Sequence, residues 1–266
     1  MNAELLLMFT LGCDRAYLYG HPERLLTDEE AARYTDALTQ RATGMPAQYI
    51  TGHQEFWGMD FIVSPAVLIP RPETEHVVER VLDLLPDWRG VRATHDASGR
   101  PKLVDVGTGS GCIALALAKD LPQAEIHATD ISTESLEVAR ANAARLNLEP
   151  RVTFHHTDLL SGIAGPFDVI VSNPPYVGLA EEDQVQLEVR KFEPRTAVFA
   201  GQSGLEIIER LVPQALAVLK PGGWLVIEMS GTIAESARKL FTGWINVQVT
   251  PDLQGIPRVL SAQKAS

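Results

Sequence analysis

Cysteine is scarce in this 266-residue sequence, which contains only Cys13 and Cys112. The two lie far apart in unlike surroundings, so they form neither a disulfide framework nor a spacing typical of metal ligands. Small disulfide-held scaffolds and cysteine-ligated zinc domains are thereby excluded. We predict a cytoplasmic protein with no bound metal.

Long apolar runs are also missing. None approaches the roughly 20 residues needed to cross a membrane. The apolar start, MNAELLLMFTLG, lacks the basic residues and the cleavage site of a signal peptide, so we predict a buried helix there. No membrane partner is expected.

Basic residues are outnumbered, with 23 Lys and Arg against 34 Asp and Glu and a formal net charge of −11. A partner held mainly through its phosphates requires a basic surface. We therefore expect no direct nucleic-acid partner.

The chain divides into three parts. Residues 1–50 have a helical pattern, residues 51–70 predict a β-hairpin connector broken at Gly58 and Pro65, and residues 71–266 form the main domain. In the first part, Thr27 and Glu30 have the spacing of a capping box. An apolar helical stripe follows, made of Ala31, Tyr34 and Leu38.

The main domain begins with a helix whose apolar face comprises Val77, Val78, Val81, Leu82 and Leu85. Pro86 ends this helix, and polar residues over 87–101 predict a loop. Strands are expected near 102–106, 124–129, 151–155, 167–172, 223–229, 244–249 and 257–262. Helices are expected over 111–120, 132–147, 204–219 and 231–242. The alternation predicts an open α/β sheet with helices on both faces and an antiparallel finish.

A glycine loop follows the first of these strands, in KLVDVGTGSGCIALALAKD. Gly107, Gly109 and Gly111 allow a tight turn and the close approach of a ligand. Their G-x-G-x-G spacing differs from the G-x-G-x-x-G of a nicotinamide site. Cys112, at the helix start, is interpreted as a packing residue and not as a reactive thiol.

Asp130 ends the next strand, where an acid is placed to accept hydrogen bonds from both ribose hydroxyls. Beside the glycine loop, this role is favoured over an N-cap for the helix from Ser132. Together the two features predict an adenosine-type ligand with little phosphate, so S-adenosylmethionine fits better than a dinucleotide.

A third acid, Asp158, is placed to reach the adenine amino group, although a solvated loop aspartate is an equal alternative. His155 and His156 precede it. They point to opposite faces of a strand, so they form no shared metal site and are interpreted as structural.

The stretch SNPPY ends another strand and places Asn173 where open α/β sheets bind ligands. Pro174 and Pro175 lack N–H donors, so the site offers two acceptors, the Asn173 side-chain oxygen and the Pro174 carbonyl. We call this pair of acceptors a fork, and it suits a planar NH₂ group, which has two donors. A plain Pro-Pro turn is the alternative, disfavoured beside the glycine loop.

Such a fork activates an amide nitrogen. Holding both N–H bonds turns the nitrogen lone pair toward an incoming methyl group, and the positive charge that develops strengthens both hydrogen bonds in the transition state. Tyr176 is placed to stack on the planar group and set the approach.

SNPPY downstream of DVGTGSG resembles the amino-methyltransferases of adenine, cytosine or glutamine amide nitrogens, and these motifs alone do not choose among the three. Two further stretches, AQYITGHQEFWGMDFIVSPAVLIPRPETEHVVERVL and VRKFEPRTAVFAGQSGLEII, closely resemble the bacterial release-factor glutamine methyltransferases. The resemblance implies a seven-stranded Rossmann-like methyltransferase domain after a small helical domain and a hairpin. It also implies methylation, by S-adenosylmethionine, of the glutamine in the Gly-Gly-Gln motif of release factors 1 and 2. Separately from the resemblance, a monomer is expected.

The resemblance carries over to individual residues. Its methyl-donor site corresponds to Gly107, Thr108, Gly109, Ser110, Gly111, Asp130, Asp158, Leu159 and Asn173. Its substrate motif corresponds to Asn173, Pro174, Pro175 and Tyr176, of which Asn173, Pro174 and Tyr176 are catalytic. At Leu159 the family can carry an aromatic residue against the adenine. The family's RPxTE turn corresponds to Arg71, Pro72, Glu73 and Thr74, whose individual roles stay open beside a helix-start function.

The first residues of the sequence resemble the middle of the family's helical domain. We therefore expect either that an upstream helix is missing or that the start codon has been assigned too far downstream. The ribosomal-protein glutamine methyltransferases are the nearest alternative, but their turn reads more like Arg-Ser-Pro-Ile than RPETE. A nucleic-acid adenine methyltransferase is disfavoured by the acidic charge and the lack of a recognition domain. A non-catalytic binding module is disfavoured by the intact motifs.

Overall fold

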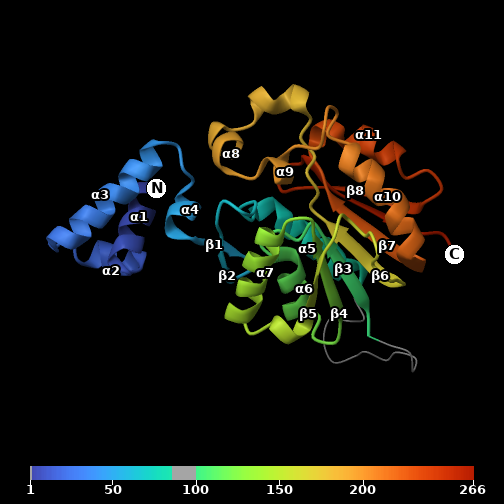
Figure 1. Ribbon diagram of the computed structural model, residues 1–266, viewed down its shortest axis with the longest axis horizontal. Coiled ribbons are helices and arrows are strands. Elements are labelled where there is room, and N and C mark those ends of the chain that lie inside the picture. The colour runs from blue at the N-terminus through green and yellow to red at the C-terminus, as the bar shows by residue number, and fades with distance from the viewer. Residues whose placement is uncertain (1, 86–99) are drawn as a thin grey trace.

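The computed structural model describes residues 2–85 and 100–266. Figure 1 shows the N-terminal helices as a separate unit, joined through a small hairpin to an α/β body. The stop expected at Pro86 and most of the loop expected over 87–101 lie outside the described residues. Among the described helices, none is long and apolar enough to cross a membrane.

The N-terminal unit consists of α1 (Asn2–Leu11), α2 (Arg15–Gly20), α3 (Asp28–Ala42) and α4 (Ala47–Thr51). The capping box is confirmed, since the Glu30 N–H donates to Thr27 Oγ1 and the Thr27 N–H donates to Glu30 Oε2. The unit's small core comprises Leu6, Ala37 and Ala47, with Tyr34 and Ile50 packed against it.

Two expectations about this unit are wrong in detail. Leu38 is 37% exposed and does not belong to the buried stripe of α3, because Ala37 faces α1 and α4 instead. The first helix forms as expected but is only partly buried, with Leu6 and Thr10 inside and Phe9 half exposed. In α3 the inward-facing residues are at positions 34 and 37, which have i, i+3 spacing. The next residue, Leu38, therefore points to the surface.

The connector begins with the predicted hairpin, β1 (His53–Phe56) paired antiparallel with β2 (Met59–Ile62). An extended segment then leads to η1 (Pro72–Thr74) and α5 (Glu75–Leu84), whose predicted apolar face is buried. The hydroxyl groups of Tyr49 and Ser135 donate to the carbonyls of Val67 (2.7 Å) and Ala66 (2.9 Å). The segment is thus held between the helical unit and the sheet domain.

The sheet has the strand order β5-β4-β3-β6-β7-β9-β8, with β9 antiparallel to both neighbours. The strands are β3 (Lys102–Val106), β4 (Glu125–Asp130), β5 (Val152–His156), β6 (Phe167–Ser172), β7 (Leu219–Glu228), β8 (Ile245–Pro251) and β9 (Pro257–Gln263). The predicted strands and the antiparallel finish are confirmed. Only β7 differs notably, because it begins four residues before the expected 223.

Helices cover both faces of the sheet, as predicted (Figure 1). One face packs on α5, α6 (Cys112–Asp120) and α7 (Thr133–Arg145), and the other on α10 (Glu206–Val218) and α11 (Ala234–Lys239). The central strands bury both faces: Leu103 points into the first core and Val104 into the second. The described part of the chain also contains short elements: η3 (Glu149–Arg151), η4 (Leu179–Gln184), α8 (Leu187–Phe192), α9 (Arg195–Val198) and η5 (Gly231–Ile233).

Helix α8, which sequence patterns did not predict, contacts the helical unit. Arg41 pairs with Glu188 at 3.0 Å, and Lys191 Nζ donates to the Thr43 carbonyl at 3.0 Å. The segment after β6 therefore bridges the C-terminal end of α3 and the sheet domain.

Candidate active site

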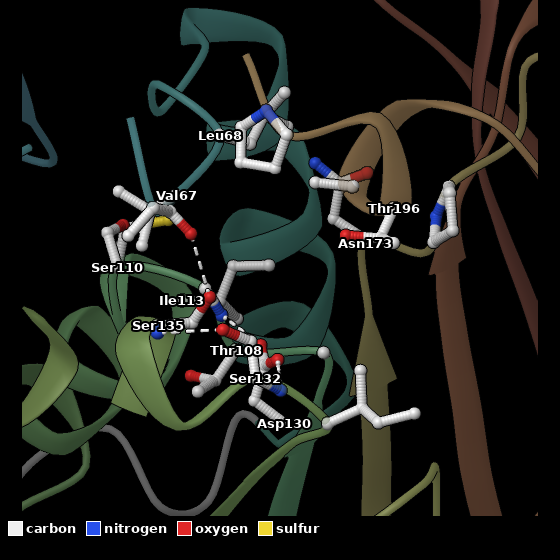
Figure 2. A pocket seen from close by; sticks show the side chains of 18 of the residues that line it. Val67, Leu68, Thr108, Ser110, Ile113, Asp130, Ser132, Ser135, Asn173 and Thr196 are labelled. Atoms are coloured by element: carbon white, nitrogen blue, oxygen red, sulfur yellow. Dashed lines mark hydrogen bonds between the residues drawn. The ribbon is translucent and has the colours of Figure 1, made fainter. Parts of the chain in front are cut away.

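A cavity of about 510 Å³ opens at the carboxyl ends of β3, β4, β5 and β6. The connector and the RPETE turn that follows it wall the cavity with residues between Pro65 and Thr74, and the segment 194–199 closes another side. Figure 2 shows Asn173 and Thr196 on one side of this space and Val67, Ser110 and Ser135 on the other. Of the predicted site residues, the cavity is lined by Gly107, Thr108, Gly109, Ser110, Asp130, Asp158, Leu159, Asn173 and Pro175.

The glycine loop forms the tight turn that its spacing predicts. Gly107, Gly109 and Gly111 all have positive φ, and the N–H groups of Gly107 and Thr108 both donate to the Thr129 carbonyl. Gly111 lies at φ +84°, and a Cβ there would be 3.2 Å from Ala139 Cβ. Only glycine therefore lets α6 start this close to α7.

A buried amide ties this loop to the hairpin. Asn142 of α7 is 0% exposed. Its Oδ1 accepts from the Ile62 N–H (2.7 Å), and its Nδ2 donates to the carbonyls of Ile62 (3.0 Å) and Ser110 (2.9 Å). One side chain thus fixes the connector and the glycine loop relative to each other.

Replacing Asn142 by alanine is expected to destabilise the protein by about 2–4 kcal/mol, because it leaves three backbone groups of β2 and the glycine loop without the partner they have in the buried Asn142 side chain. The melting temperature should fall by roughly 6–12 °C in a chain of this length. The exposed Glu137 on the same helix supplies the control, and Glu137→Ala should change stability by no more than about 0.5 kcal/mol. Equal effects of the two substitutions in urea unfolding would contradict the structural role of Asn142.

Asp130 lies at the cavity wall at the end of β4. Its Oδ2 accepts from the Gly109 N–H and its Oδ1 from the Ser132 N–H, each at 2.9 Å. Ser132 itself caps α7, since its hydroxyl accepts from the Ser135 N–H. The N-cap alternative for Asp130 is therefore wrong. The residue lines the cavity, and its contact with a ribose diol stays a prediction.

Asp105, beneath the glycine loop, was not identified from the sequence. It is 1% exposed and accepts from Thr108 Oγ1 (2.6 Å) and the Ala114 N–H (3.2 Å). Burial raises the pKa of Asp105 to about 7, and the nearby Asp130 charge adds to the rise. An acid between the apolar residues Val104 and Val106 of the strand KLVDV was the signal that could have pointed to it.

Asp158 and Leu159 both line the cavity, after β5. The Asp158 carboxylate pairs with the guanidinium of Arg210, which projects from α10 and was not predicted. Leu159 has a positive φ of 52°. The solvated-loop alternative is thus incomplete for Asp158, while its contact with an adenine stays a prediction.

The two histidines make local contacts, and Cys112 belongs to the first core but also lines the cavity, so their purely structural role stays a prediction. His155 Nε2 lies 2.9 Å from His127 Nδ1, whereas His156 Nε2 lies 2.9 Å from the Ile131 carbonyl. No group of three metal-ligating side chains occurs within residues 2–85 and 100–266. Burial raises the pKa of the Cys112 thiol to about 12, so this cysteine is protonated and unreactive.

Asn173 lies immediately beyond β6. Its Nδ2 donates to Thr74 Oγ1 at 3.2 Å. Within the described chain, neither Asn173 Oδ1 nor the Pro174 carbonyl accepts a hydrogen bond. The loop that follows is fixed by the Val177 N–H donating to Val198 and by the Ala200 N–H donating to Val177. A rigid loop therefore carries two unengaged acceptors.

Pro174 and Tyr176 lie behind this edge and do not line the cavity. The Tyr176 hydroxyl donates to Glu228 Oε1 at 3.1 Å, and burial raises the pKa of Tyr176 far above its ordinary value. The stacking of Tyr176 on a substrate amide stays a prediction.

Arg71 of the RPETE turn lines the cavity and pairs with Glu193, a buried carboxylate that was not predicted. Glu193 Oε2 also accepts from the Ile69 N–H at 3.2 Å. The Glu193 carboxylate therefore joins the stretches RPETE and VRKFEPRT. Glu75, the last residue of the first stretch, lies 118 positions before Glu193 in the sequence.

The family comparisons match both parts of the chain. Residues 93–191 match the Methyltransferase small domain family, and residues 1–52 match the PrmC N-terminal domain family. The solved structures with similar folds include a methyltransferase from Pyrococcus furiosus, 21% identical, with a TM-score of 0.56 over 89% of this chain and 100% of that one. They also include the N-terminal domain of human METTL16 in complex with SAH, 19% identical, with a TM-score of 0.54 over 90% of this chain and 84% of that one. At these identities the likeness shows a shared fold.

Curated relatives are far more similar. The release factor glutamine methyltransferase of Koribacter versatilis (strain Ellin345) is 56% identical over 99% of this chain and 91% of its own length. The protein of the same name from Bradyrhizobium diazoefficiens is 42% identical over 99% of this chain and 88% of its own length. With such identity across both the helical unit and the sheet domain, the chain belongs to the release factor glutamine methyltransferase family.

Proposed function

We propose that this protein transfers a methyl group from S-adenosylmethionine to the side-chain amide nitrogen of the glutamine in the Gly-Gly-Gln motif of peptide chain release factors 1 and 2. The observation that carries the proposal is the pair of unengaged acceptors, Asn173 Oδ1 and the Pro174 carbonyl, beside a cavity that begins at the glycine loop. The names of the curated relatives supply the substrate class. The protein is proposed to act in the cytoplasm as a monomer.

The three-part division is part of the proposal. Residues 1–50 would serve as a helical domain, residues 51–70 as the hairpin connector and residues 71–266 as the methyltransferase domain. The connector supports this division because it walls the cavity and contacts the helical unit through Tyr49.

The cavity fits this methyl donor. Its volume lies within the range of small-molecule sites, about 300–1,000 Å³. The two arginines that line it, Arg71 and Arg210, are each paired with a carboxylate, so neither is free for a phosphate. We assign the donor to Gly107, Thr108, Gly109, Ser110, Gly111, Asp130, Asp158, Leu159 and Asn173. When bound, S-adenosylmethionine supplies an electrophilic methyl group on a positively charged sulfur.

The chain's own groups activate the amide. Asn173 Oδ1 and the Pro174 carbonyl accept the two N–H bonds, which orients the nitrogen lone pair toward the methyl group. A nitrogen–carbon bond forms as the carbon–sulfur bond breaks, and the positive charge that develops on nitrogen strengthens both hydrogen bonds. The methylated nitrogen then loses a proton to water, so no basic side chain is required.

The substrate assay is the test of this proposal. The purified chain, supplied with a methyl-labelled donor, should label a release factor, and a Gln→Asn change in the Gly-Gly-Gln motif should abolish labelling because it moves the amide one methylene away from the acceptors. A ribosomal protein and DNA are the parallel substrates. Labelling of either one alone would replace the release-factor assignment with one of the alternative methyltransferase activities.

A further inference from the structure

A buried carboxyl group ends β7, next to the strand that leads to Asn173. Strands β6 and β7 are parallel neighbours in the sheet (Figure 1), and Glu228 is the last residue of β7. Glu228 is 1% exposed, and its Oε1 accepts from the Tyr176 hydroxyl at 3.1 Å. Within residues 2–85 and 100–266, its Oε2 has no hydrogen-bond partner. Burying a carboxyl group is costly unless it is hydrogen-bonded, so the contact with Tyr176 gives a reason for an acid in the apolar run LVIE.

The loop after β6 has few other hydrogen bonds. Pro174 and Pro175 have no N–H group to donate. In the described part of the chain, the Tyr176 N–H donates no hydrogen bond, and the carbonyls of these three residues accept none. The loop is held at its start through the Asn173 side chain and from Val177 onward by backbone hydrogen bonds. Between these two points, the Tyr176 hydroxyl makes the one hydrogen bond among the described residues that fixes the loop to the sheet.

We propose that Glu228 is a positioning residue for methyl transfer, which fixes the Pro174 carbonyl by holding the Tyr176 hydroxyl. This role rests on the proposed function, in which that carbonyl is one of two acceptors for the substrate amide. Neither Glu228 nor Tyr176 lines the cavity, so both act through the loop. Anchoring of the loop depends on the hydroxyl group of Tyr176, whereas stacking on a substrate amide would depend on its ring.

The two prolines transmit the restraint to the acceptor. Each proline ring fixes φ near −65°, so Pro174 and Pro175 cannot absorb a displacement of Tyr176 by rotation about φ. A shift of the Tyr176 side chain therefore moves the Pro174 carbonyl with it. Displacements of reacting groups by about 1 Å lower rates by about a hundredfold, so a smaller loosening of this loop has a measurable effect on turnover.

The kinetic test compares variants that keep or remove this one hydrogen bond. Tyr176→Phe keeps the ring and removes the hydroxyl, Glu228→Met removes the acceptor and puts an apolar side chain in its place, and Glu228→Gln keeps an oxygen acceptor. We expect Tyr176→Phe and Glu228→Met each to lower kcat about tenfold, the size of one hydrogen bond, with KM and donor affinity within about threefold. Glu228→Gln should restore kcat to within about threefold of the parent chain.

The double variant distinguishes one shared hydrogen bond from two independent roles. Tyr176→Phe combined with Glu228→Met should lower kcat no further than either change alone. Ser261 of β9 supplies the control, because it is 0% exposed and accepts from Arg80 Nε at 3.0 Å, so Ser261→Ala should lower the melting temperature without changing kcat. Additive losses in the double variant, full turnover in Tyr176→Phe, or a Glu228→Gln variant as slow as Glu228→Met would overturn the proposal.

A measurement without a methyl acceptor separates this role from the proposed function. Amide hydrogen exchange at Val177 and Ala200, whose N–H groups donate to the carbonyls of Val198 and Val177, reports how often the loop opens. We expect exchange about tenfold faster in Tyr176→Phe and Glu228→Met, and near the parent rate in Glu228→Gln. Exchange at the parent rate in the first two variants would refute the role of Glu228, whichever molecule is the methyl acceptor. Failure of the parent chain to label a release factor would overturn the proposed function and leave the exchange result unaffected.

Discussion

Replacing Asn173 by alanine is expected to lower the rate of methyl transfer by about a hundredfold or more, the usual loss for a transition-state hydrogen bond. In the proposed mechanism the side chain supplies one of two acceptors that strengthen as charge develops on the substrate nitrogen, so its loss would raise the barrier to the chemical step. The proposal assigns donor binding mainly to the glycine loop and Asp130, so donor affinity should stay within about threefold. Methyl transfer at saturating donor and calorimetric titration measure the two quantities separately.

Asp130→Ala is the reciprocal comparison. Its carboxylate faces the cavity from β4 and contacts the glycine loop, so its removal should weaken donor affinity more than it lowers turnover at saturating donor. The two variants should therefore show opposite patterns. If Asn173→Ala lost donor affinity and turnover to the same extent, the assignment of Asn173 to the substrate amide would be wrong.

Replacing Gly204 by alanine is expected to lower turnover by about a hundredfold, although Gly204 does not line the cavity, because displacing reacting groups by about 1 Å has effects of that size. Gly204 has φ +83°, and a Cβ there would lie 2.4 Å from the Tyr176 carbonyl oxygen and 3.0 Å from the Gly178 nitrogen. Both are backbone atoms of the loop that carries Asn173, so the loop must move. Turnover and melting temperature measure the effect.

Gly243 is the matched control for this substitution. It has φ +86°, close to that of Gly204, but a Cβ there would meet nothing within 4 Å. Gly243→Ala therefore carries the same backbone strain, about 1 kcal/mol, without the contact with the loop that carries Asn173. Its turnover should stay near that of the parent chain. Equal losses of turnover in both variants would mean that strain alone, and not displacement of the loop, explains the effect of Gly204→Ala.

The elements of the sheet domain and its motifs could be predicted because each depends on a local sequence pattern. Buried strands alternate with amphipathic helices, and a glycine loop or a proline pair marks the strand ends that bind ligands. Asp130 and Asn173 follow from these patterns alone. Both lie at the cavity, and both do so at the ends of strands that the sequence identifies.

The supporting residues were not predictable in the same way, since each meets its partner only through the topology. Glu228 ends the strand β7 next to the strand that leads to Asn173 because β7 pairs with β6, and Thr74 contacts Asn173 because η1 precedes a helix packed on that face. Arg210 and Glu193 similarly pair with residues 52 and 122 positions away. The short helices α8 and α9 were missed because six and four residues are too few to show a helical period.

The most direct test of the account is a structure of the protein with S-adenosylhomocysteine and a Gly-Gly-Gln peptide from a release factor. We predict that the glutamine side-chain nitrogen lies about 3 Å from both Asn173 Oδ1 and the Pro174 carbonyl oxygen, with its free face toward the sulfur. A glutamine nitrogen bound elsewhere, with Asn173 Oδ1 engaged by its own loop, would contradict the mechanism.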